Sequence, residues 1–256
     1  MRSPLAFSLV RSAVLAAAVV CCLQPTAPAH ASSVNLRWNG CWGDGAVANR
    51  TFACNTNFGG EALVGSFVSP AAVHGVITHD FIVDVGFEGS SVPAWWQFKN
   101  AGSCRLSSLV ISTALPISAV QCIDWASFGP LTTFIAYLTF PNLTSIRGSL
   151  TVPSEAAAEI SAGQEYFSFQ LAINHQKTVG QGACGGCDVG ACISLRRLTL
   201  HTLPGSFDQF LSIGSSPGDQ PGDARALWQL LSPGAICDLA TPVRNRTWGE
   251  VKALYR

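Results

Sequence analysis

The segment from Gln164 to Leu203 constrains the fold most, because it joins two strand patterns through a loop that carries cysteines. Apolar and polar residues alternate over Tyr166–Asn174, which is typical of a half-buried β-strand. A second pattern covers Ile193–Thr202, and its phase changes at Arg196 and Arg197, which predicts a β-bulge. We expect the two strands to form a long hairpin. The apolar face of the first strand would consist of Phe167, Phe169, Leu171 and Ile173.

The N-terminal residues 1–31 are typical of a secretory signal peptide. Arg2 is followed by an apolar run over Ala13–Leu23, and Ala29-His30-Ala31 is a small-residue cleavage pattern. We expect cleavage near Ala31 and a secreted or extracellular protein, in the periplasm or on the cell surface. No later segment approaches the roughly 20 apolar residues of a transmembrane helix, so no transmembrane span is predicted.

Cysteines beyond residue 31 indicate a disulfide framework. Their number is even, as expected for disulfides in an exported chain. They are Cys41, Cys54, Cys104, Cys122, Cys184, Cys187, Cys192 and Cys237. Eight cysteines allow ~105 pairings. Proximity in the sequence favours Cys41 with Cys54 and Cys104 with Cys122. The other four would pair among themselves, with Cys237 tying the C-terminal region to the loop between the two strands.

The remaining patterns predict an all-β protein: an antiparallel β-sandwich of jelly-roll or immunoglobulin-like type, stapled by disulfides. We expect the β-sandwich domain over residues 32–203, an irregular Gly/Pro-rich extension over 204–242 and a tail helix over 243–256. A Thr247-x-x-Glu250 capping box begins that short C-terminal helix. Further strands are expected at 34–38, 62–67, 80–87, 105–113, 131–140 and 144–152, with a short helix or turn at 154–162.

Charge excludes some partners. Beyond residue 31 the chain has 13 Lys and Arg against 15 Asp and Glu, because Arg2 and Arg11 belong to the signal peptide. A nearly neutral chain without a basic stripe offers no surface for nucleic acid. No cofactor motif stands out, so no cofactor is predicted.

The loop cysteines also suit a metal. Thiolates at the spacing of Cys184-Gly-Gly-Cys187 and Cys192 can converge on zinc or an iron–sulfur cluster, with Cys237 or His175 as the fourth ligand. Export argues against this alternative, because an oxidising compartment converts such thiols to disulfides. We therefore predict no metal site.

The most aromatic stretch, Pro93–Phe98, suggests a ligand site. An exposed Trp face stacks on sugar rings and other flat ligands. The predicted ligand-binding residues are Trp95, Trp96, Gln97, Lys99 and Trp125. The alternative, which we favour because Trp is buried on average, is that the Trp side chains belong to the core.

No catalytic motif is recognisable. The chain lacks a His-x-x-x-His pattern, and its Gly-x-Ser-x-Gly match, Gly214–Gly218, lies in the Gly/Pro-rich extension and not in the strand-to-helix turn of a nucleophile elbow. A Ser–His–Asp triad needs only to converge in space. Asp80, Asp84 and Glu88 could supply the two carboxylates of a glycoside hydrolase. A solvated strand face is the favoured explanation of these acids, so no catalytic residue is assigned.

Several motifs carry a resemblance. They are Phe52-Ala-Cys54-Asn-Thr-Asn57, Pro93-Ala-Trp95-Trp96, Gly102-Ser-Cys104-Arg105 and Lys177-Thr-Val-Gly180 leading to Gly182-Ala-Cys184-Gly-Gly-Cys187. This combination, over most of residues 34–203, resembles a group of uncharacterised secreted bacterial proteins with a Cys-rich β domain. The closing Thr247-Trp248-Gly249 to Leu254-Tyr255-Arg256 resembles a short tail of other exported bacterial proteins. The resemblance implies no activity and no site residues.

Together these patterns favour a secreted or cell-surface non-enzymatic module that binds a glycan or assembles with other surface components. The expected partner is a polysaccharide or a surface component. The alternative is a secreted hydrolase whose site is assembled from distant residues. A third hypothesis makes Trp248–Arg256 a recognition segment for an export or anchoring partner.

Overall fold

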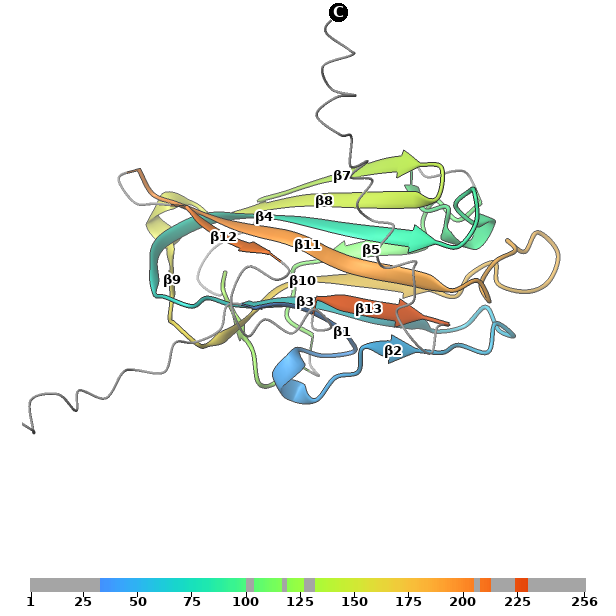
Figure 1. Ribbon diagram of the computed structural model, residues 1–256, viewed down its shortest axis with the longest axis horizontal. Helices are drawn as coiled ribbons and strands as arrows, with labels where there is room; N and C mark the ends of the chain where they lie inside the picture. The colour runs from blue at the N-terminus through green and yellow to red at the C-terminus, as the bar shows by residue number, and fades with distance from the viewer. Residues whose placement is uncertain are drawn as a thin grey trace, which may run out of the picture.

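The chain folds into two β-sheets that face each other across one core (Figure 1). The computed structural model describes residues 33–99, 104–116, 119–126, 132–204, 208–212 and 224–229. The predicted all-β, mainly antiparallel sandwich is confirmed. The predicted signal peptide, the predicted tail helix and Cys237 lie outside the described residues. Among the described residues, no helix has the length and apolar character needed to span a membrane.

The first sheet has the strand order β1-β3-β10-β5, with β6 parallel to β10. These strands are β1 (Ser33–Trp38), β3 (Gly60–Val68), β5 (Leu109–Ser112), β6 (Ile123–Asp124) and β10 (Glu165–Asn174).

The second sheet has the order β2-β13-β11-β4-β8-β7, with β12 beside β11 and β9 beside β4. Its strands are β2 (Asn49–Arg50), β4 (Val73–Phe87), β7 (Thr132–Phe140), β8 (Leu143–Thr151), β9 (Ala158–Ile160), β11 (Ala191–Thr202), β12 (Gln209–Ser212) and β13 (Arg225–Trp228). Short 3₁₀ turns lie at η1 (Trp42–Asp44), η2 (Ala94–Trp96) and η4 (Ser154–Ala156).

The expected hairpin between residues 164 and 203 is wrong. The strand β10 pairs with β3 and β5 in the first sheet, whereas β11 pairs with β4 in the second. The connection between them therefore crosses from one sheet to the other. Alternation could not reveal this, because two strands that face each other across a core show the same pattern as two strands that pair. The predicted bulge is confirmed, since the register of β11 against β4 shifts between Leu195 and Arg197.

A second bulge divides the apolar face of β10. The register against β3 shifts between Phe167 and Phe169. Phe169, Leu171 and Ile173 join the main core, whereas Phe167 belongs to a separate small cluster with Cys41 and Cys122. The four residues are all buried, but the expectation that they share one face is wrong for Phe167.

The predicted extension also contributes to the sandwich. The apolar residues near Trp228 form β13, which pairs with β11. Residues 209–212 form β12, which also pairs with β11. Both strands had been expected to be irregular. The predicted helix or turn at 154–162 is a single 3₁₀ turn followed by the short strand β9.

Disulfides join segments that lie far apart in the sequence. The bonds are Cys41–Cys122, Cys54–Cys187 and Cys104–Cys184, with sequence separations of 81, 133 and 80 residues. The pairing of near neighbours was therefore wrong, because strand order rather than sequence distance brings cysteines together. Cys192 is also disulfide-bonded, to a partner outside the described residues. Its predicted link to Cys237 stays a prediction.

Two glycines leave room for a stacked pair of phenylalanines at the centre of the core. The rings of Phe81 and Phe169 stack across the two sheets with centroids 4.0 Å apart. Gly148 lies opposite Phe81 on β8, and Gly65 lies opposite Phe169 on β3. A Cβ atom at either glycine would overlap the facing ring. The distance between the sheets at this point therefore depends on both glycines.

We predict that Gly148→Ala destabilises the protein by about 1–3 kcal/mol, because the added methyl group overpacks a filled core. Urea unfolding gives the free energy. Gly185→Ala is the matched control, since a Cβ there meets no atom within 4 Å. Adding Phe81→Leu to Gly148→Ala should recover part of the loss. Equal stability of the two single variants would contradict this packing.

A histidine is enclosed in the same core. His79 is fully buried, 4.9 Å from the ring of Trp125, and its Nε2 lies 2.9 Å from Ser168 Oγ. Burial lowers the pKa of His79 to about 3 and outweighs the opposing effect of Asp80. The side chain is therefore neutral in the folded protein at physiological pH.

This histidine makes stability depend on pH. The unfolded chain binds a proton at His79 near pH 6.5, whereas the folded chain does so only near pH 3. Its contribution is therefore complete above about pH 6.5 and is lost as the pH falls toward 3. Between pH 7.5 and 5.0 we expect protonation of His79 in the unfolded chain to lower the free energy of unfolding by about 2 kcal/mol. Urea unfolding of His79→Gln should show a smaller loss over this interval, and an unchanged loss would refute the assignment.

Candidate functional site

The predicted aromatic site is part of the core. Trp95 and Trp96 lie on the 3₁₀ turn η2 and are 0% and 1% exposed, and Trp125 is also buried. The rings of Trp95 and Trp228 stack 5.2 Å apart, and Trp96 meets Trp228 edge-on. The prediction of an exposed Trp face is wrong, and the core alternative is confirmed. The reason is that β13 brings Trp228 beneath both rings.

The two polar residues predicted beside these rings are only half-buried. Gln97 Nε2 donates a hydrogen bond to the carbonyl oxygen of Val92 at 3.4 Å. Lys99 has a backbone φ of 50°, so it turns the chain after η2. The structure therefore brings Gln97 and Lys99 near the aromatic cluster without forming an open platform for a ligand.

A buried arginine holds this aromatic cluster in place. The guanidinium carbon of Arg105 lies 3.7 Å from the centre of the Trp95 ring, and one guanidinium nitrogen donates to the Trp95 carbonyl oxygen at 2.8 Å. A second nitrogen donates to the carbonyl oxygen of Asn174 at the end of β10. Burial lowers the pKa of Arg105 to about 9, which leaves it charged at neutral pH. Arg105 thus ties η2 to the first sheet.

We predict that Arg105→Ala lowers the free energy of unfolding by about 3–5 kcal/mol, because the carbonyl oxygens of Trp95 and Asn174 lose their donor and the missing side chain leaves a cavity beside Trp95. Arg105→Lys should not restore stability, because an ammonium group can neither stack on Trp95 nor reach both carbonyls. Thermal and urea unfolding measure both variants, with Arg147→Ala as the control at an exposed site. A loss for Arg105→Ala as small as that of the control would contradict the proposed role.

A small cavity lies between the sheets beside Trp96. Its volume is about 10 Å³, close to the minimum for one water molecule and far below that of a ligand pocket. The lining is apolar apart from Trp96, Tyr137 and Thr144. Burial raises the pKa of Tyr137 to about 12, so its hydroxyl stays protonated. We assign no ligand to this cavity.

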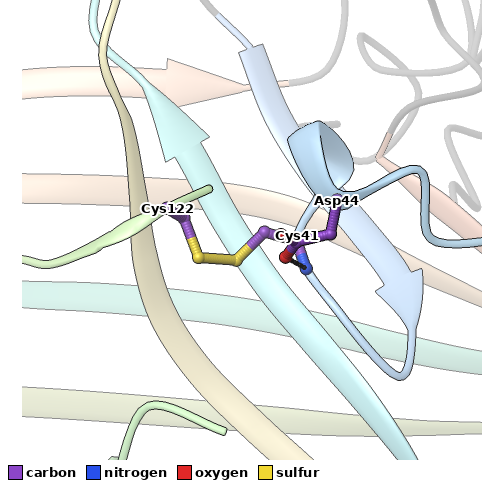
Figure 2. Close-up of side chains that lie close together, drawn as sticks. All are labelled: Cys41, Asp44 and Cys122. Carbon is purple, nitrogen blue, oxygen red and sulfur yellow. Dashed lines mark hydrogen bonds between the residues drawn. A yellow bond between two sulfur atoms is a disulfide. The ribbon is translucent and has the colours of Figure 1, made fainter. Parts of the chain in front are cut away.

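The cysteine clusters do not form a metal site in the described part of the chain. Cys184 and Cys187 are bonded to different partners, so the thiolates that zinc or an iron–sulfur cluster needs are absent and that alternative is wrong. Figure 2 shows Asp44 beside the Cys41–Cys122 disulfide, where the sulfurs are bonded to each other. One carboxylate oxygen of Asp44 accepts from the Cys41 amide at 2.9 Å.

Asp44 also reaches the segment that carries Cys122. Its other carboxylate oxygen accepts hydrogen bonds from the amides of Val120 and Gln121, at 3.0 and 2.9 Å. Because the carboxylate joins both sides of the disulfide, its role is structural.

Two of the acids considered for catalysis, Asp80 and Asp84, are held by basic side chains. His201 lies between Asp80, 3.0 Å from Nε2, and Asp208, 2.8 Å from Nδ1. Asp84 is buried and lies 3.3 Å from Arg196, so its predicted exposure is wrong. Burial lowers the pKa of His201, but hydrogen bonds and charges of both acids outweigh burial, so the net pKa is raised.

These contacts give no catalytic centre among the described residues. Both nitrogens of His201 face carboxylates, so neither can take a proton from a nucleophile. The pair of Ser168 and His79 has suitable geometry, but it is sealed in the core.

The second sheet ends in an exposed edge strand, β7. The strand β7 lies along the upper border in Figure 1 and, among the described strands, pairs only with β8. On its outer face Phe134, Leu138 and Phe140 are 67%, 38% and 48% exposed. The sequence has no charged residue from Leu131 to Leu143. We call Thr132–Phe140 the β7 edge.

Other sheet edges in the described part of the chain are shorter or carry charge. The strands β5 and β2 have four and two residues, and β1 contains Arg37. Proteins normally protect a long edge strand with charge, proline or a bulge, because its free amides pair readily with another strand. The β7 edge has nine residues and none of these protections.

The amides that β7 offers to a partner can be identified. The Phe87 amide donates to the carbonyl oxygen of Asn142, which fixes the hydrogen-bond pattern between β4 and β8. Because backbone groups of successive residues in a strand point to opposite sides, the even-numbered residues of β8 form hydrogen bonds with β4 and the odd-numbered residues form them with β7. Odd-numbered β8 residues lie opposite even-numbered β7 residues. The remaining amides and carbonyls of β7 therefore point away from the sheet. They belong to Thr133, Ile135, Tyr137 and Thr139.

The sequence predicted this strand but not its position at the edge of the sheet. Residues 131–140 were predicted as a strand, and the structure confirms one over Thr132–Phe140. Its position at the edge could not be read from local patterns. The usable signal was an uncharged strand with large apolar residues on both faces.

No protein-family model and no curated protein matches this chain. The resemblance to uncharacterised secreted bacterial proteins therefore stays a prediction.

Proposed function

We propose that the protein is a secreted, non-enzymatic module that assembles with other surface components by accepting a strand at the β7 edge. The observation that carries this proposal is the unprotected edge, with outward amides beside Phe134, Leu138 and Phe140. Strand addition uses the backbone for affinity and the alternating side chains for specificity. Disulfides suit an oxidising extracellular location.

The other sequence-based hypotheses gain less support. Glycan binding was based on Trp95 and Trp96, and both rings are buried. A hydrolase needs two accessible carboxylates or an accessible Ser–His pair. Of the acids considered, Asp80 is hydrogen-bonded to His201 and Asp84 is paired with Arg196, and the Ser168–His79 pair is buried. Cleavage near Ala31 is part of our proposal. Recognition of Trp248–Arg256 by an export or anchoring partner stays a separate hypothesis, because the tail lies outside the described residues.

We predict that Phe134→Lys releases the exported protein from the surface of the producing cells, because a charge within the edge opposes strand addition. The retained fraction, measured by immunoblot of washed cells and medium, should fall several-fold. Phe58→Lys is the matched control, since Phe58 is 88% exposed in a loop far from β7 in the sequence. Equal retention of the two variants would refute the role of this edge.

A further inference from the structure

We infer that the strand accepted at the β7 edge is the same strand of a second copy, in antiparallel orientation and centred on Ala136. This inference rests on the proposed function and names its partner. The two copies would then form one continuous sheet through a two-fold axis at Ala136.

Backbone geometry selects this register. The outward groups belong to odd-numbered residues, so an antiparallel partner must place odd-numbered residues opposite odd-numbered ones. Centring on Ala136 pairs Thr133 with Thr139 and Ile135 with Tyr137. It is also the register in which every residue of Thr132–Phe140 has a partner, because Ala136 is the middle residue.

The side chains match in the same register. On the inner face, Ile135 of each copy would lie opposite Tyr137 of the other, a β-branched residue beside an aromatic one. On the outer face, Phe134 would lie opposite Leu138. Both outer side chains are exposed in the single chain, so pairing covers apolar surface that otherwise faces water.

Charge does not oppose the pairing. The nearest charged side chain across β8 is Arg147, which lies opposite Ala136 and is exposed. In the paired sheet the two Arg147 strands would be three strand spacings apart, roughly 14 Å. Repulsion over that distance is largely screened at physiological salt. The uncharged β7 edge of a second copy is therefore compatible with the uncharged β7 edge of the first.

The size of the contact predicts a reversible dimer. A single strand pair buries less than the roughly 1,200 Å² of a stable protein–protein interface. We therefore expect monomer and dimer to exchange with concentration, rather than a permanent oligomer.

Sedimentation velocity of the purified, oxidised protein over a hundred-fold concentration range tests the pairing. The wild type and Phe58→Lys should shift from monomer to dimer, and Phe134→Lys should stay monomeric. Thr133→Pro removes an outward N–H without touching a bond to β8, so it should also abolish the dimer. Circular dichroism and melting temperature check that each variant is folded. A wild type that stays monomeric throughout, or a dimer unaffected by Phe134→Lys and Thr133→Pro, would overturn the inference.

Disulfide trapping tests the register. In Ala136→Cys the two new thiols would face each other across the axis, at a Cα separation of roughly 4.5 Å that a disulfide can bridge. Mild oxidation should give a covalent dimer in high yield. In Phe134→Cys the two thiols would be separated by four residues along the strand, so the yield should be low. Preferential trapping by Phe134→Cys would show that the register is wrong.

The two proposals fail in different ways. If the purified protein is monomeric while cell-surface retention still depends on Phe134, the second copy is refuted and strand addition from another chain survives. If retention is also independent of Phe134, both proposals are refuted.

Discussion

The crossing between β10 and β11 sets the whole arrangement, because it carries the chain from one sheet to the other. Two disulfides hold this connection, one from Cys54 to Cys187 and one from Cys104 to Cys184. Inside it, Thr178 accepts a hydrogen bond from the Trp95 indole and donates one to the His175 carbonyl oxygen. A glycine-rich loop that would otherwise sample many conformations is thereby fixed against the aromatic cluster.

The crossing also determines which strand is left at the edge. Once β11 lies in the second sheet it pairs with β4, β4 pairs with β8, and β8 with β7. The last strand in this series has apolar residues on its outer face and no charge. A strand of this kind is either a hazard for aggregation or a site of assembly. In a chain stapled by disulfides and filled by a close-packed core, we favour assembly.

Local features were predictable from the sequence, and long-range ones were not. Alternation located most strands, and the phase change at Arg196 and Arg197 located a bulge, since both depend on neighbouring residues. Disulfide partners and the burial of Trp95 and Trp96 depend on strands such as β13 that arrive from distant parts of the chain. The same limit hid the candidate site, because no local pattern shows which strand lies at an edge.

Residue-resolved hydrogen exchange tests the central claim most directly. The account predicts that raising the protein concentration slows exchange at Thr133, Ile135, Tyr137 and Thr139, whose amides point outward, and leaves the even-numbered amides of β7 unchanged. Equal exchange of the outward amides in dilute and concentrated samples would contradict pairing of this edge with a second copy.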